Sequence, residues 1–127
     1  MGCTSRKRNM VNLYIPKQGD IIFVNFSDTL GHEKDGNRPA IVISNDVFNR
    51  YTNMVIVCPI SSNTKEFPTH YKLEDTKKIH GSVFCEHIRS IDYHQRRVKF
   101  VEKASVNDLL CTLMIFNACL DENDTIL

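Results

Sequence analysis

The 127-residue chain contains no tryptophan, few glycines and prolines, and very little net charge. Its five glycines and four prolines follow no period, which excludes a collagen-like or low-complexity chain. A net charge of +1 is far below that of proteins that coat long duplex DNA. Hydrophobic residues make up 42% of the chain, enough to build a core, so we expect a single folded domain rather than disorder.

Cysteine pairs of the C-x-x-C kind are also absent. The five cysteines are an odd number, and four of them lie in apolar runs, so we expect reduced buried thiols rather than disulfides or a zinc site. No two histidines stand four residues apart on a predicted helix, and the chain has neither a P-loop nor a dinucleotide-binding fingerprint. We therefore expect no metal site and no cofactor.

Long hydrophobic runs are missing as well. The most apolar stretch, residues 109–120, is too short to span a bilayer and contains Thr112 and Asn117. No apolar segment follows the basic cluster at residues 6–8, so no signal peptide is expected. We predict a soluble, cytoplasmic protein without membrane contact. Its expected parts are a flexible basic tail (1–13), one domain (14–120) and an acidic C-terminal tail (121–127).

Short runs of apolar and β-branched residues predict a series of strands. These runs cover residues 21–26, 39–44, 54–60, 70–73, 82–91 and 98–101. Between 45 and 53 we expect a turn with one helical turn at most. From Ser105, a predicted N-cap, the spacing of the apolar residues changes from that of a strand to that of a helix, which is predicted to continue to Leu120. The pattern predicts a mostly β fold, a small SH3-like antiparallel barrel with a C-terminal α-helix.

Apolar residues occupy two sides of the predicted C-terminal helix. One stripe comprises Val106, Leu109, Leu113, Phe116 and Leu120, and the other side carries Met114, Ile115, Ala118 and Cys119. A helix that is apolar on two sides of so small a domain indicates a packed partner. We therefore expect a homodimer.

A polar loop at residues 29–39 ends at Arg38, where the second predicted strand begins. A guanidinium group anchored there can bind a phosphate through two hydrogen bonds. It can equally pair with Glu33 or Asp35, which is the purely structural alternative.

Two further polar segments interrupt the apolar strands. Residues 61–65 carry hydroxyl and amide groups that can bind a phosphate or a base, or can satisfy the backbone of a turn. Residues 86–89 offer an acid, a histidine and a cation, or simply surface ion pairs. Strand alternation would place Glu86 on one face, with His87 and Arg89 on the other.

Together and in this order, these segments resemble the MazF/PemK family of toxins from toxin–antitoxin systems. The resemblance covers residues 14–120, and its most specific part is the string G-x-E-x-x-G-x-R-P from Gly31 to Pro39. Further matches are Gly19-Asp20-Ile21-Ile22, Ala40-Ile41-Val42-Ile43-Ser44, Asn49-Arg50, Pro59-Ile60-Ser61 and Ile88-Arg89-Ser90-Ile91-Asp92.

The resemblance implies a dimeric SH3-like barrel that cleaves single-stranded RNA (mRNA) at a specific sequence without a metal. The ribose 2′-hydroxyl would attack the adjacent phosphate, leaving a 2′,3′-cyclic phosphate and a 5′-hydroxyl. Such chemistry needs a proton acceptor, a proton donor and cations, which these segments contain. The implied partners are the RNA substrate, a second copy of the chain and a cognate antitoxin, with DNA contacted only through the antitoxin.

The resemblance also implies four catalytic candidates. Arg38 matches the family's catalytic arginine, and Ser61 stands where many members have a catalytic threonine. His32 aligns with a histidine that some members use at the scissile phosphate, and Glu86 lies where some place an acidic candidate base. Those members have an arginine where this chain has Phe84, so a mechanism that relies on that arginine cannot operate unchanged here.

Sequence selectivity is expected to come from the loops, because splayed bases need stacking surfaces and hydrogen-bond partners. The RNA-binding candidates are Thr29, Gly31, Glu33, Asn49, Arg50, Ser62, Asn63, Lys65 and Arg89. Phe48 is a further candidate, although Phe48 and Phe67 equally fit a packing role.

Two alternatives to a nuclease stay open. One is a barrel toxin that binds and poisons a protein target such as DNA gyrase. The other is a member that folds and dimerises but no longer cuts RNA. The Gly36-x-Arg38-Pro39 string favours the nuclease, because the gyrase-poisoning branch does not depend on that loop arginine.

Overall fold

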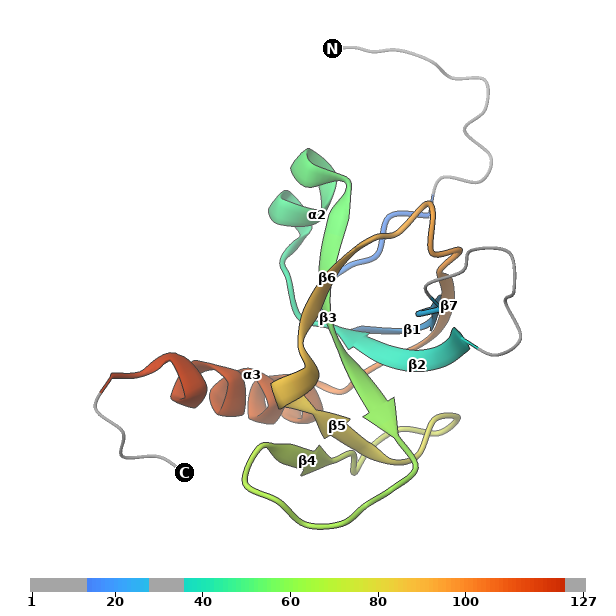
Figure 1. The fold of residues 1–127 in the computed structure, drawn as a ribbon. Coiled ribbons are helices and arrows are strands. Elements are labelled where there is room, and N and C mark those ends of the chain that lie inside the picture. The colour runs from blue at the N-terminus through green and yellow to red at the C-terminus, as the bar shows by residue number, and fades with distance from the viewer. Residues whose placement is uncertain (1–13, 28–35, 123–127) are drawn as a thin grey trace, which may run out of the picture.

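The structure is a computed structural model that describes residues 14–27 and 36–122. Antiparallel strands form a seven-stranded sheet in the order β4-β5-β3-β2-β1-β7, with β6 also paired to β3 (Figure 1). The strands are β1 (Asp20–Asn25), β2 (Asn37–Val42), β3 (Met54–Ser61), β4 (His70–Lys72), β5 (Ser82–Phe84), β6 (Arg89–Asp92) and β7 (Lys99–Lys103). The helices are α2 (Asp46–Thr52), the 3₁₀ turn η2 (Cys85–His87) and α3 (Val106–Leu120). This arrangement confirms the predicted mostly β class with a C-terminal helix.

Strand β3 lies at the centre of the sheet and is buried on both faces. One of its edges pairs with β2, and the other pairs with β6 along its first half and with β5 at its end. Side chains on one face of the sheet pack against α3, and those on the other face fill a second core under β6. Because successive strand residues point to opposite faces, Ile21 belongs to the first core and Ile22 to the second.

The predicted continuous strand at residues 82–91 is wrong. The chain pairs with β3 as β5, leaves it through η2, and returns to β3 as β6. The N–H of Ile88 donates to the Cys85 carbonyl within this turn, at 3.3 Å. The apolar alternation continues through the turn, so the sequence pattern does not reveal the interruption.

Residues 46–52 form a helix rather than the predicted turn. Asn45 caps α2, because its side chain accepts the N–H of Phe48 at 2.9 Å. Asn53 ends the helix in a left-handed conformation (φ 58°), which asparagine tolerates well. Helix α2 therefore covers the N-terminal end of β3 (Figure 1).

The N-terminus of α3 is the predicted one. The Ser105 side chain accepts the N–H of Asp108 at 2.9 Å. Instead of completing a capping box, the buried Asp108 carboxylate accepts a hydrogen bond from the Tyr71 hydroxyl (2.6 Å) and the N–H of Asp75 (3.0 Å). Asp108 thereby ties α3 to the segment that follows β4.

The buried stripe of α3 differs from the predicted one. Its packed side chains are Leu109, Leu113, Ile115 and Phe116, with Asp108 and Thr112 buried between them. Val106 and Leu120, predicted to share this stripe, are 73% and 68% exposed. Leu110 and Met114 are also exposed, so a line of apolar side chains at four-residue spacing faces away from the sheet.

The four cysteines within the described residues are free thiols. Cys58 and Cys85 are buried as expected, Cys111 is half-buried, and Cys119 is exposed, contrary to the expectation of burial. None of the described helices has the length and apolar character that crossing a membrane requires.

Candidate active site

A cavity of about 480 Å³ opens at the C-terminal end of β3. Segments far apart in the sequence contribute to its wall: the end of β1, the start of β2, the end of β3, and the β5–η2–β6 segment. Its lining residues are Phe26, Arg38, Pro59, Ile60, Ser61, Phe84, His87 and Arg89. The structure thus brings two predicted catalytic residues, Arg38 and Ser61, and the predicted RNA-binding Arg89 to one cavity.

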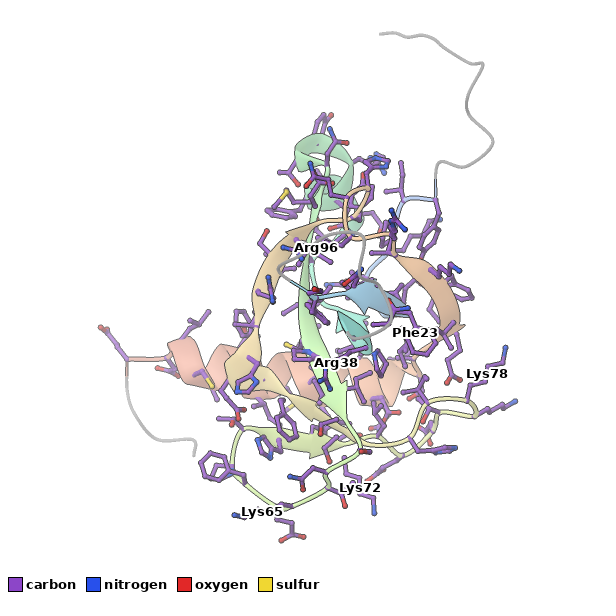
Figure 2. All side chains as sticks on the ribbon, turned by 45° about the vertical axis from the view of Figure 1, so that its right-hand side comes forward. Phe23, Arg38, Lys65, Lys72, Lys78 and Arg96 are labelled. Carbon is purple, nitrogen blue, oxygen red and sulfur yellow. The ribbon has the colours of Figure 1, made fainter. Side chains whose placement is uncertain are left out.

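Arg38 is positioned at the start of β2, where this strand pairs with β1. It is the second residue of β2 and lies opposite Val24 of β1, while the following part of β2 pairs with β3. Its side chain is exposed (Figure 2). Among the described residues no carboxylate lies within ion-pair distance of its guanidinium group. None of the described carboxylates therefore neutralises its positive charge.

Gly36 allows the chain to enter β2 close to the end of β1. A Cβ atom at this position would lie 2.4 Å from the Asn25 side-chain oxygen and 2.4 Å from the Ser27 nitrogen. The Phe26 N–H also donates to the Gly36 carbonyl, at 2.8 Å. This close approach is the physical reason for a glycine two residues before Arg38.

Ser61 ends β3 at the floor of the cavity. Its hydroxyl oxygen accepts the N–H of Asn63 at 3.0 Å, which leaves the hydroxyl proton available for donation. Gly81 packs against the backbone of Ser61. Its φ is 148°, and a Cβ atom at this position would lie 2.2 Å from the Ser61 carbonyl oxygen. Gly81 is thus a positioning residue that the sequence analysis missed.

His87 and Arg89 form the wall provided by η2 and β6. The Arg89 guanidinium carbon lies 5.1 Å from the centre of the Phe26 ring, a cation–π contact that holds it beside the cavity. The exposed His87 ring meets the Phe84 ring edge to face at 5.8 Å. His87 and Arg89 share a side as predicted, although a 3₁₀ turn and not strand alternation places them there.

Glu86 is not among the residues that line the cavity, and its carboxylate is bonded to residues at the start of β4. Its carboxylate accepts the Thr69 hydroxyl at 2.6 Å and lies 2.8 Å from His70 Nε2. Burial raises the pKa of Glu86, but the hydrogen bonds from Thr69 and His70 together outweigh it and hold the pKa below the usual range. Glu86 is therefore ionised at neutral pH and is a weak proton acceptor.

His70 is a second residue that the sequence analysis did not identify. Its ring stacks on Phe84, with the ring centres 3.7 Å apart and the planes 5° from parallel. Phe84 thereby joins His70 to His87 through ring contacts on both sides. No signal in the sequence reveals this stacking, because His70 and Phe84 become neighbours only when β4 pairs with β5.

A second cavity, of about 550 Å³, lies beside β4. It is lined by Thr64, Lys65, Glu66, Phe67, Pro68, His70, Lys72 and Ser82. The turn interpretation of residues 61–65 is supported, while binding of a phosphate or base there stays a prediction. Ser61 and Asn63 accept backbone hydrogen bonds within the loop, as a turn requires, while Lys65 lines this cavity. Figure 2 shows Lys65 and Lys72 on the loop and strand near the base of the molecule.

Known proteins match both the sequence and the fold. A family model described as the PemK-like, MazF-like toxin of type II toxin–antitoxin systems matches residues 17–114. The chain belongs to this family. The endoribonuclease toxin MazF of Escherichia coli K12 is 33% identical over 87 residues, which cover 68% of this chain and 78% of that protein. The endoribonuclease EndoA of Bacillus subtilis 168 is 36% identical over 84 residues, covering 61% and 72%.

Solved structures of family members share the fold. MazF of Deinococcus radiodurans superposes with a TM-score of 0.74 at 31% identity and covers 84% of this chain and 97% of that one. A MazE–MazF complex from the same organism gives a TM-score of 0.73 at 28% identity and covers 84% of this chain and 96% of that one.

Two RNA-binding candidates lie far from the cavity. Asn49 and Arg50 belong to α2, at the opposite end of the eight-residue β3, so that roughly 20 Å of strand separates them from Ser61. Asn49 is fully buried, and its side-chain amide donates to the Pro16 carbonyl at 2.8 Å. Its burial and this hydrogen bond argue against the predicted RNA contact of Asn49, which stays a prediction.

The remaining candidates either line neither cavity or lie outside the described residues. Arg50 and Ser62 are exposed but line neither cavity. Phe48 is half-buried on α2. The candidates that fall in the β1–β2 loop lie outside the described residues: Thr29, Gly31, His32 and Glu33. Within residues 14–27 and 36–122, no three His, Cys, Asp or Glu side chains are grouped to hold a metal ion.

Proposed function

We propose that this toxin-family endoribonuclease cleaves single-stranded RNA in the cavity at the end of β3, in a step that needs no metal ion. The observation that supports this is the grouping of Arg38, Ser61 and Arg89 around one cavity. Cleavage of cytoplasmic mRNA by attack of the ribose 2′-hydroxyl would give a 2′,3′-cyclic phosphate and a 5′-hydroxyl.

The residue types suit the charge that develops in this reaction. Two guanidinium groups that line one cavity can bind both non-bridging oxygens of a phosphate and stabilise the additional charge of the pentacovalent transition state. The Ser61 hydroxyl can donate one further hydrogen bond to the phosphate. A volume of about 480 Å³ falls within the range of sites that enclose small ligands, which suits one nucleotide.

The second cavity gives the RNA a path beyond the scissile phosphate. Lys65 and Lys72 supply positive charge for the neighbouring phosphates, and the 55% exposed Phe67 ring offers a stacking surface for a base. Ser62 and Asn63 lie on the loop between the two cavities. We therefore place the next nucleotides of the substrate along the β3–β4 loop.

We propose two protein partners. The exposed apolar line of Val106, Leu110 and Met114 on α3 supports a homodimer, because contiguous apolar surface of this kind marks protein contacts. The solved MazE–MazF complex of D. radiodurans supports a cognate antitoxin. DNA would be contacted only through that antitoxin.

The test is cleavage of a long, unstructured RNA by the purified protein in the presence of EDTA, with the 5′ ends of the fragments mapped. We expect discrete cuts at one short motif with 5′-hydroxyl ends. Lys78→Ala is the matched control for Arg38→Ala, because Lys78 is an exposed cation outside both cavities (Figure 2). Intact RNA together with gyrase trapped on DNA would favour the protein-poisoning alternative instead.

A further inference from the structure

One imidazole faces the cavity at the end of β3. Among the described residues that line it, His87 alone has a side chain that ordinarily gains and loses a proton near neutral pH. Arginine stays protonated throughout this range, and a serine hydroxyl is a very weak acid. Arg38, Arg89 and Ser61 can therefore bind the phosphate, but none of them readily accepts a proton from a ribose hydroxyl.

Glu86 stands behind His87 and is held firmly. Its carboxylate oxygen Oε2 lies 4.0 Å from His87 Nε2 and 2.8 Å from His70 Nε2, and its other oxygen accepts the Thr69 hydroxyl. A fixed, ionised carboxylate beside an imidazole stabilises the imidazolium that forms when the ring takes up a proton. The charged groups that face His87 are Arg38 of β2, Arg89 of β6 and Glu86 of η2, with His70 of β4 behind Phe84.

The aromatic ring of Phe84 completes the arrangement. It stacks on His70 on one side and meets the His87 ring on the other, so that His87 is packed against a rigid pair of rings although 62% of its side chain is exposed. An exposed imidazole with one packed edge can reach a substrate and keep its orientation. His87 therefore lines the cavity wall, with a carboxylate oxygen 4.0 Å from its Nε2.

We propose that His87 is the general base of RNA cleavage and that Glu86 is a positioning residue for it, an inference that rests on the proposed function. The neutral imidazole takes the proton of the 2′-hydroxyl as the O2′–P bond forms. The P–O5′ bond breaks, and the leaving 5′-oxygen takes a proton from solvent. Glu86 keeps its charge throughout and stabilises the imidazolium, which later returns its proton to water.

The experiment is the pH dependence of single-turnover RNA cleavage by the full chain and by His87→Gln. General-base catalysis is typically worth about 10²- to 10⁴-fold in rate, so His87→Gln should slow cleavage by at least about 10²-fold. The wild-type rate should fall on the acid side of neutral pH, and this limb should be absent from the variant. Binding of an RNA with 2′-deoxyribose at the scissile position should stay within about 2-fold, since a base acts on the reacting hydroxyl.

Two further variants separate positioning from folding. Glu86→Gln should slow single-turnover cleavage and leave binding of the 2′-deoxy RNA within about 2-fold, because the charge beside the imidazolium is lost, whereas a purely structural role would weaken both. His94→Gln is the matched histidine control. His94 is exposed on the β6–β7 turn, outside both cavities, so its variant should keep the wild-type profile.

The possible results are distinct. Cleavage by His87→Gln at the wild-type rate, with the acid limb retained, overturns this inference and leaves the proposed function standing. Loss of the limb in His32→Gln, with the limb retained in His87→Gln, assigns the base to the β1–β2 loop and also overturns it. Intact RNA with the folded wild-type protein overturns the proposed function and this inference together.

Discussion

Polar residues near the two ends of β3 lie in opposite environments. At its N-terminal end, Asn49 is fully buried: its amide nitrogen donates to the Pro16 carbonyl, its amide oxygen accepts the Ser44 hydroxyl, and its backbone carbonyl accepts the Tyr93 hydroxyl. At its C-terminal end, Arg38 and His87 are exposed around a cavity. Figure 1 shows α2 closing the first end, with the β4–β5 hairpin beside the second.

The difference shows how polar residues divide between folding and function. Buried polar groups are almost always hydrogen-bonded within the protein, and breaking those bonds costs stability. Polar groups that converge on a cavity without internal partners contribute little to stability and are available to a ligand. Variants at the first end should therefore change the free energy of unfolding, and variants at the second should change catalysis.

The largest expected effect is that of Arg38→Ala on cleavage. Removal of one preorganised donor to a charged transition state costs about 10²- to 10³-fold in rate. Since Arg38 is exposed, the free energy of unfolding should change by no more than about 0.5 kcal/mol. RNA cleavage rates and urea unfolding of the same preparation test both statements. Wild-type cleavage by this variant would remove Arg38 from the active site.

Asn49→Ala should show the opposite behaviour. It leaves the buried Ser44 hydroxyl and the Pro16 carbonyl without their partner, which should cost about 2–3 kcal/mol of stability. The cleavage rate per folded molecule should stay at the wild-type level, because Asn49 lies at the far end of β3. Chemical unfolding gives the first quantity, and cleavage at a temperature where the variant stays folded gives the second. A stable variant that binds RNA poorly would contradict the burial argument.

Ser61→Ala probes the cavity floor with a smaller change. Loss of one hydrogen bond to the charged phosphate should slow cleavage by about 10- to 100-fold. Ser61→Thr keeps the hydroxyl and serves as the matched control, so it should retain most of the activity. Both variants should unfold at nearly the wild-type urea concentration. If alanine and threonine behaved alike, the hydroxyl would have no part in catalysis.

The smallest effect concerns Glu102 on β7, which lies at neither end of β3. Burial raises the pKa of Glu102, but the backbone N–H groups of Lys77, Ile79 and Lys78 outweigh it and hold the pKa below its usual range. A lowered folded-state pKa gives stability that is present above the unfolded value of about 4.3 and is lost as pH falls through the folded value.

Glu102→Gln should therefore be about 1 kcal/mol less stable than the wild type at pH 7, from weakened hydrogen bonds. The two proteins should converge in stability below pH 4, which urea unfolding at several pH values can measure. The pH dependence of cleavage near neutrality should be the same in both. If the stability of both proteins also changed near neutral pH, in step with the cleavage rate, the cleavage profile would report unfolding rather than a titrating base.

Local patterns along the chain were sufficient for several predictions. Alternating apolar residues located β1, β2 and β3, and Ser105 marked the start of α3, because these features depend on neighbours within a few residues. The prediction of one continuous strand at 82–91 was wrong, because this segment pairs with β3 as two separate strands, β5 and β6. That change depends on contacts from segments distant in the sequence.

The active-site candidates divide in the same way. Arg38 and Ser61 were identified by the string around Gly36 and by the end of a strand, and both line the cavity. Asn49 was an RNA candidate by residue type, yet its amide is used by Pro16, 33 residues away. His70 and Gly81 were not identified at all. His70 contacts Phe84 across the β4–β5 pair, and Gly81 contacts Ser61 at the end of β3, so both roles depend on tertiary contacts.

The sequence by itself determined the class of fold, the position of the C-terminal helix and the family, because periodicity, caps and a glycine–arginine string are local properties of the chain. Only the tertiary structure decided which polar side chains are exposed around the cavity and which are bonded in the core. It turned Glu86 toward His70 and left His87 facing Arg38 and Ser61. The physical reason is that burial and hydrogen-bond partners are set by segments that meet only when the sheet has formed.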